Sequence, residues 1–435
     1  MSARKPARRR AWRDLGVDLG PLRRYRDYRL LFASGAITML GSFITLIAAP
    51  VQVKALTDSY LAVGLIGLAE FVPTIVGGLY GGVIADSRDR RTVAVACEFV
   101  LMALVLVLVV NAMLPDPHVW PVFVAAALIA GAAAVQRPSL DALLPRTVPA
   151  GQLHGAIALL GIRSNIGAIA APALGGVLAA SSLPIAYGVN AATFALSALL
   201  LVRLGSYPPT GGPARIRIQD MTLGVRYAMT RRDLLGTYAV DIAAMVLAIP
   251  LALYPFLADD YGHPGQVGLL FVAMPAGAAL ASALSGWTGR IRRPGLAVAW
   301  AAAAWSLSLA VAGLMPAFWL LLLFLAAAGS ADMISGIFRL TLWNTTIPDE
   351  LRGRMAGLEM LSYTVGPMAG GARAALMADA VGLRAAVAGG GALGLLGVGA
   401  AAAAFPALRR FDLAQWRAAQ APAPTEPTAA PGAVA

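Results

Sequence analysis

The sequence predicts an all-α integral membrane protein with twelve transmembrane helices in two pseudo-symmetric six-helix bundles. Hydrophobic residues make up 59% of the 435 residues and charged residues only 13%, whereas a soluble domain has about 45–50% apolar and about 25% charged residues. The apolar residues gather in twelve runs, most of them near the roughly 20 residues that a helix needs to cross a bilayer. Matching positions in the two halves indicate that a six-helix unit is repeated.

The runs are interpreted as helices because apolar and polar residues do not alternate along them, as they do in the strands of a membrane barrel. The segment FVLMALVLVLVV at 99–110 is an example. Helices also satisfy all backbone hydrogen bonds inside lipid. In chain order the predicted spans are about 30–53, 61–85, 92–113, 120–137, 155–180, 185–203, 234–257, 265–288, 294–314, 317–338, 355–378 and 384–407.

Polar segments divide the chain into parts. The predicted parts are a basic cytoplasmic tail (1–29), an N-terminal six-helix bundle (30–203), a cytoplasmic central loop (204–233), a C-terminal six-helix bundle (234–408) and a largely disordered cytoplasmic tail (409–435). In the central loop, Met221, Val225 and Ala228 share one helical face, which predicts an amphipathic helix on the inner leaflet.

The basic residues indicate the orientation in the membrane. An even number of spans puts both termini on one side, and that side then holds most of the 34 Lys and Arg residues, whereas the opposite loops hold only Lys54 and Arg384. The positive-inside rule makes the basic side cytoplasmic. The strong preference for Arg over Lys suggests a bacterial genome, so we expect a bacterial inner membrane. The net charge of +12 is then a topology signal, and nucleic-acid binding is disfavoured.

The sequence lacks the residues that several classes of function need. Cys97 is the single cysteine, and the three histidines are scattered without metal-ligand spacing. The sequence contains no GxSxG, HExxH or GxxxxGK[ST] motif, which disfavours a membrane enzyme. A sensor or scaffold would need a larger soluble part than the central loop. We therefore predict a transporter without metal or cofactor, which works as a monomer in lipid on a small-molecule substrate.

The two halves share a register. The triplet VGL occurs at 63–65 and 267–269, Pro50 and Pro255 precede these triplets at similar distances, and Pro149 corresponds to Pro348. Transporters built from such repeats bind substrate between the repeats, near the middle of the membrane. We expect the binding site there.

A short charged stretch carries a family resemblance. GGVIADSRDRR at 81–91 resembles the loop motif between helices 2 and 3 of the major facilitator superfamily, with matches at Gly82, Asp86, Arg90 and Arg91. Longer segments, such as PVQVKALTDSYLAVGL and IPDELRGRMAGLEML, resemble the enterobactin-exporter branch of that superfamily, whose near relatives include macrolide-type drug efflux proteins. The resemblance implies the major facilitator fold and export by alternating access.

The resemblance also implies a conformational latch on the cytoplasmic face. Asp86 would meet the N-terminus of helix 11, where a carboxylate gains about 0.3–2 kcal/mol from the helix dipole. Arg90 would pair with an acid at the end of helix 4, for which Asp141 is the candidate. Ser87 and Asp89 depart from the motif, which suggests a weaker latch. The alternative is that these charges only set topology.

A second motif lies in predicted helix 5. NIGAIAAPALGG resembles the antiporter motif of the superfamily, with matches at Gly167, Pro172, Gly175 and Gly176. The resemblance favours export. The alternative is ordinary helix packing, because Gly167, Ala171 and Gly175 form a stripe of small residues.

Ionisable residues inside spans are the remaining candidates, because they are costly in lipid. Asp241 is our first choice for the proton-coupling acid, followed by Glu70 and then Glu359, and the proton motive force would drive transport. A purely structural role for Asp241 is the alternative. The predicted substrate-cavity residues are Arg163, Asp332 and Arg339. Asp332 and Arg339 share a helix face but are predicted to lie too far apart to pair, and Arg163 could instead pair with Glu359.

Together these features predict a secondary active exporter, working as a proton antiporter, for an enterobactin-type siderophore or another small amphipathic molecule. The alternative is a broad-specificity, macrolide-type drug efflux pump.

Overall fold

The computed structural model describes residues 18–208 and 226–420, apart from the side chains of 349–350, 352–365 and 417–420. All regular structure in this part of the chain is helical. The N-terminal half comprises α2 (Gly20–Arg24), α3 (Arg26–Thr57), α4 (Tyr60–Ser87), α5 (Arg90–Met113), α6 (Trp120–Thr147), α7 (Leu153–Ser181) and α8 (Leu183–Val202). The C-terminal half comprises α10 (Arg232–Ala248), α11 (Tyr254–Asp260), α12 (Val267–Ala283), α13 (Pro294–Leu314), α14 (Phe318–Thr346), α15 (Asp349–Val381) and α16 (Leu383–Ala404), and then α17 (Pro406–Arg410) and α18 (Leu413–Gln420).

These helices make twelve spans. Eleven segments of the described chain are long and apolar enough to cross a membrane, with α10 and α11 counted as one. The twelfth is α15, which has 33 residues and a lower mean hydropathy because it carries several charges. Large apolar side chains such as Val110, Trp300 and Leu396 are exposed on the outer surface, as expected of a surface that faces lipid.

Two spans differ from the predicted segments at proline residues. The fourth span was predicted to end near 137, but α6 continues to Thr147 with Pro138 and Pro145 inside the helix. The seventh span was predicted as one helix, but it breaks after Ala248, next to Pro250, and resumes as α11. The break leaves backbone carbonyls without helical partners. The guanidinium of Arg373 donates to two of them, the carbonyls of Val246 and Ile249, each at 3.2 Å.

The central loop is described only in part. Residues 226–230 are helical, and Ala228 is buried. Met221 and Val225 of the predicted amphipathic helix lie outside the described residues.

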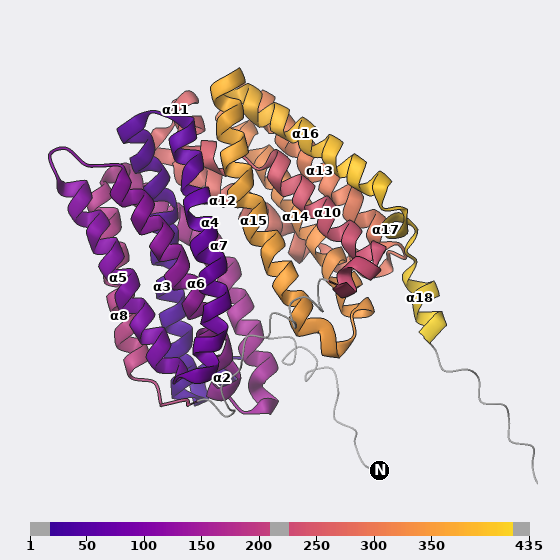
Figure 1. Cartoon of the computed structure of the whole chain (residues 1–435), viewed down its shortest axis with the longest axis horizontal. Helices are drawn as coiled ribbons and strands as arrows, with labels where there is room; N and C mark the ends of the chain where they lie inside the picture. Colours follow the sequence, from indigo (N-terminus) through magenta and orange to yellow (C-terminus); the bar gives the residue numbers. More distant parts are fainter. Residues whose placement is uncertain (1–17, 209–225, 421–435) are drawn as a thin grey trace, which may run out of the picture.

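The two halves lie side by side and touch at one end of the bundle (Figure 1). At that end α4 contacts α15, and a Cβ placed on Gly64 would lie 2.5 Å from the Cβ of Ala375. Lys54, at the end of α3, forms an ion pair with Asp259 of α11. The rings of Tyr60 and Phe256 are 4.4 Å apart.

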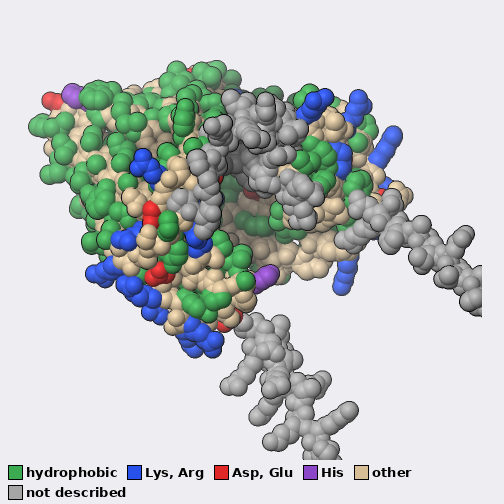
Figure 2. Space-filling model, turned by 60° about the horizontal axis from the view of Figure 1, so that its bottom comes forward, with side chains coloured by type: hydrophobic (Ala, Val, Ile, Leu, Met, Phe, Trp, Pro, Cys, Tyr) green, Lys and Arg blue, Asp and Glu red, His purple; other side chains and the backbone are tan. Residues whose placement is uncertain are grey.

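At the other end the halves separate. We call it the basic end, because the starts of α3, α5 and α10 bring Arg26, Arg90 and Arg232 there. Figure 2 shows Lys and Arg side chains on this face and a hollow between the two halves. The motif glycine Gly82 is near this end, and a Cβ placed on it would meet no atom within 4 Å. In the part of the chain that the structure describes, the bundle is therefore closed at one end and open at the other.

Candidate transport site

A cavity of about 480 Å³ lies between the two halves. The N-terminal half contributes residues of α3, α4, α6 and α8, and the C-terminal half contributes residues that follow the break after α10, together with residues of α12 and α15. Its wall is mostly apolar, with aromatic rings from Phe194 and Phe271. Its polar side chains are Ser42, Thr45, Asn190 and Glu70. The volume falls in the usual range for a small-molecule site.

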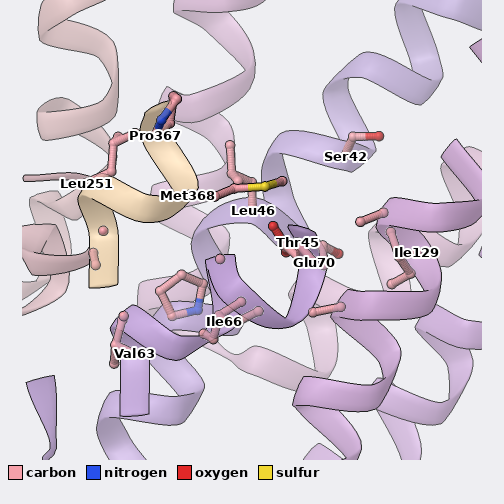
Figure 3. Close-up of a pocket in the computed structure, with 18 of the residues that line it drawn as sticks. Ser42, Thr45, Leu46, Val63, Ile66, Glu70, Ile129, Leu251, Pro367 and Met368 are labelled. Carbon is pink, nitrogen blue, oxygen red and sulfur yellow. The ribbon is translucent and has the colours of Figure 1, made fainter. Parts of the chain in front are cut away.

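Among the described residues that line this cavity, Glu70 is the only ionisable one. It stands ten residues after Tyr60, the first residue of α4, and so about 15 Å from that end of the helix. Figure 3 shows Glu70 beside Thr45, with Met368 approaching from the other half. In the described part of the chain, the Glu70 carboxylate makes no hydrogen bond or ion pair. The second choice among the predicted acids thus lines the cavity.

Asp241, Asp332 and Arg339 form a separate cluster in the C-terminal half. Arg339 of α14 is 3% exposed and forms an ion pair with Asp241 of α10. Its Nη2 lies 3.7 Å from Oδ1 of Asp332. The prediction that Asp332 and Arg339 are too far apart to pair was wrong. Residues seven apart differ by about 10 Å along the helix axis, but the long arginine side chain spans this distance.

Packing between α10 and α14 fixes this cluster in place. The indole of Trp343 donates to the hydroxyl of Thr237 at 3.0 Å and stacks on Tyr238, with ring centroids 5.2 Å apart. Both contacts lie about one turn from the ion pair along the same two helices. Asp241 and Arg339 therefore join α10 to α14, and neither is among the residues that line the cavity.

Arg163 does not line the cavity either. Its guanidinium donates to the carbonyl of Phe32 at 3.2 Å and lies over the Phe32 ring at 5.6 Å. It therefore packs α7 against α3 within the N-terminal half. The side chain of Glu359 lies outside the described residues, so a contact between Arg163 and Glu359 remains a prediction.

The residues of the predicted latch are on the surface at the basic end. Asp86 is half exposed and lies 3.9 Å from Arg90, one turn further along the chain. Asp141 lies 3.9 Å from Arg137. The structure therefore pairs Arg90 with Asp86, where the sequence suggested Asp141. Arg91 donates to the carbonyl of Val202 and so ties the start of α5 to the end of α8.

Asp89, which departs from the family motif, has a local role. It is the N-cap of α5 and accepts hydrogen bonds from the amides of Arg91 and Thr92 at 2.8 and 3.3 Å. Its other oxygen accepts a hydrogen bond from Ser206. Burial by itself would raise the pKa of Asp89, but these hydrogen bonds outweigh it and lower the pKa.

The glycine motif of α7 faces two neighbours. A Cβ on Gly167 would lie 2.6 Å from Sδ of Met39, and one on Gly175 would lie 3.1 Å from Cα of Ile44, so both face α3. A Cβ on Gly176 would instead lie 2.3 Å from Cα of Gly268 in α12, across the boundary between the halves. The carbonyl of Pro172 also faces Gly268. The motif therefore packs one helix pair within a half and another between the halves.

Glu98 is a buried acid that the sequence did not single out as a site. It is 1% exposed in α5, and its Oε1 accepts hydrogen bonds from Thr38, Gln136 and Ser197 at 3.1, 3.0 and 2.9 Å. These donors come from α3, α6 and α8, so one carboxylate joins four helices. The sequence shows Glu98 as a glutamate inside an apolar run, which is a signal that it has a role. The residues that donate hydrogen bonds to it lie on three other helices, and only the fold brings them together.

Comparisons with known proteins agree with this architecture. A family model described as "Transmembrane secretion effector" matches residues 17–430. The enterobactin exporters of Citrobacter koseri and of Escherichia coli O81 are 29% and 28% identical over 361 residues, which cover 82% of this chain and 86% of each relative. The crystal structure of the nucleoside transporter NupG superposes with a TM-score of 0.69 at 13% identity, covering 88% of this chain and 99% of that one, which shows the shared fold.

The match of the family model covers nearly the whole chain, and the twelve spans form two halves around a cavity. The chain belongs to the transmembrane secretion effector family of the major facilitator superfamily, and it is a small-molecule transporter of the membrane rather than an enzyme.

Proposed function

We propose that the protein is a secondary active exporter that loads a small amphipathic molecule from the cytoplasm and releases it on the other side. The observation that carries this proposal is the asymmetry of the bundle, which is closed at one end and hollow at the basic end. The positive-inside rule makes the basic end cytoplasmic, with both termini on that side. The structure is then the inward-open state of an alternating-access cycle. One chain supplies both halves and the cavity, so a monomer is sufficient.

Proton antiport is the coupling that we favour. The Arg339 guanidinium is held by Asp241 and lies close to Asp332. Protonation of Asp241 would remove its charge and weaken its ion pair with Arg339, which would loosen the contact between α10 and α14. Asp241 would take up a proton from the outer side as the substrate leaves, and would give it up to the cytoplasm in the inward-open state, where the ion pair with Arg339 forms again.

The latch would act at the opposite point of the cycle. In the inward-open state the Asp86 carboxylate is half exposed and, among the described side chains, forms an ion pair with the neighbouring Arg90. When the basic end closes, Asp86 would approach the N-terminus of α15, where backbone N–H groups and the helix dipole favour a carboxylate. The contact would stabilise the outward-open state by roughly 1 kcal/mol.

Two classes of cargo remain. The curated relatives are enterobactin exporters, which supports a siderophore-type molecule. The mostly apolar wall of the cavity, with four polar side chains, supports the second candidate, broad-specificity efflux of drug-like molecules. Cells that lack the gene distinguish the two classes of cargo. They should retain the labelled siderophore if the protein exports siderophores, and a hydrophobic dye such as ethidium if it is a drug efflux pump.

Transport in inverted membrane vesicles tests the exporter proposal. With an acidic lumen, we expect uptake of the labelled cargo several-fold above that of vesicles without the protein, because protons that leave the lumen would drive cargo in. A protonophore should abolish the difference. Uptake that does not depend on the pH gradient would contradict proton antiport. If neither the siderophore nor the drug is taken up, export is contradicted.

A further inference from the structure

In the part of the chain that the structure describes, the central cavity has a single charged wall residue, and that residue is acidic. Glu70 projects from α4, and the rest of the lining is apolar or neutral. A carboxylate near the middle of a membrane needs compensation by a proton or a cation, because desolvation disfavours its charged form. Nothing in the described part of the chain supplies that compensation, since the carboxylate has no ion pair there.

Three arginines of the described spans are engaged elsewhere. Arg163 donates to the carbonyl of Phe32, Arg339 pairs with Asp241, and Arg373 donates to the carbonyls at the break after α10. None of the three lines the cavity. As far as its side chains are described, the wall therefore presents one negative charge with no basic side chain beside it.

We propose that this cavity is a binding site for lipophilic monovalent cations and that the Glu70 carboxylate is their counter-ion. The inference rests on the proposed function, because it names the substrate class of the same transport site. At about 6 Å and an effective dielectric constant of about 20, one ion pair corresponds to roughly a hundredfold in affinity before desolvation. A catecholate-type anion would meet repulsion of the same size.

Two further features fit such a ligand. The rings of Phe194 and Phe271 both face the cavity, and aromatic rings attract a desolvated cation. The volume of about 480 Å³ accommodates a drug-sized molecule with an apolar body. The same carboxyl group cannot hold a proton and a cationic ligand at once, so protonation of Glu70 would release the cargo.

Two ions of nearly equal size and shape but opposite charge test the proposal. Tetraphenylphosphonium is a permanent lipophilic cation, and tetraphenylborate is its anionic counterpart. We would measure their equilibrium binding to the purified full-length protein in nanodiscs, with empty nanodiscs as the blank. The wild type should prefer the cation. Glu70→Gln should weaken cation binding at least about tenfold without weakening anion binding, whereas Glu70→Asp should keep the preference for the cation.

The variants also control for folding. Glu70→Gln is isosteric, and a monodisperse profile together with retained anion binding would show that the site is intact. The proposal is overturned if wild type and Glu70→Gln bind tetraphenylphosphonium equally, if the wild type prefers tetraphenylborate, or if neither ion binds the wild type above the blank.

A transport measurement separates this inference from the proposed function. If Glu70 governs cation binding but reconstituted protein moves neither the cation nor a siderophore, the exporter proposal fails and the binding site stands. If the protein exports cargo at the same rate with Glu70→Gln and shows no preference for cations, the exporter proposal stands and the assignment of Glu70 fails.

Discussion

Asp241→Asn is expected to abolish transport driven by a proton gradient. The change is isosteric but removes a carboxylate that is paired with the almost fully buried Arg339. Breaking a buried ion pair costs about 3–5 kcal/mol when one charge is left behind, and Asp332, with Oδ1 3.7 Å from Nη2 of Arg339, should offset part of this loss. We therefore expect a folded protein with a lower Tm. Gradient-driven uptake should fall to the background of protein-free vesicles, whereas substrate counterflow without a gradient should persist.

A double variant separates coupling from a purely structural role. Asp241→Asn combined with Arg339→Gln removes both charges of the pair, so it should recover part of the Tm that the single variant loses, although Asp332 then loses its arginine neighbour. If the pair couples protons to transport, gradient-driven uptake should stay absent in the double variant. Recovery of uptake along with Tm would show that the pair only stabilises the fold, and wild-type uptake in Asp241→Asn alone would contradict its coupling role directly.

The sequence predicted the fold because the bilayer imposes strong constraints on length and polarity. Every described span was found as an apolar run. Most basic residues were predicted in alternate loops, which lie on the same side of a bundle, and the structure brings them to one end. The ends of the spans were less predictable. Composition suggested that α6 ends near Arg137, but its helix continues past Pro138 because a membrane helix tolerates proline when neighbouring groups satisfy the freed carbonyl.

The site was less predictable, because a side chain's surroundings depend on contacts between distant segments. The sequence identified Glu70, Asp241 and Arg339 as unusual charges, but it could not show which of them face the cavity. It ranked Glu70 below Asp241, whereas the structure places Glu70 on the cavity wall and Asp241 in an ion pair outside it. The three hydrogen bonds to Glu98 similarly depend on helices that are 38 to 99 residues away along the chain.

Gly176→Ala is expected to slow transport at least about tenfold, because it obstructs closure at the end opposite the basic end. An added Cβ would lie 2.3 Å from Cα of Gly268 and 2.4 Å from its amide nitrogen. Backbone on the facing helix cannot rotate away as a flexible side chain can, and close packing leaves no space to absorb the methyl group. The clash exists only while α7 and α12 touch, so the variant should disfavour the inward-open state.

Gly188→Ala in α8 is the matched control, since a Cβ there meets no atom within 4 Å. Both changes raise helix propensity by about 1 kcal/mol, so the difference between them reports the contact with α12.

The conformational shift can be measured by cysteine labelling. The single native cysteine is first replaced by Cys97→Ser, and Ile129→Cys then places a new cysteine at a position that lines the cavity. A membrane-impermeant maleimide should label this cysteine from the basic end in the control and from the opposite end in Gly176→Ala. Equal transport and equal labelling in the two variants would show that the close approach of Gly176 and Gly268 does not limit the cycle.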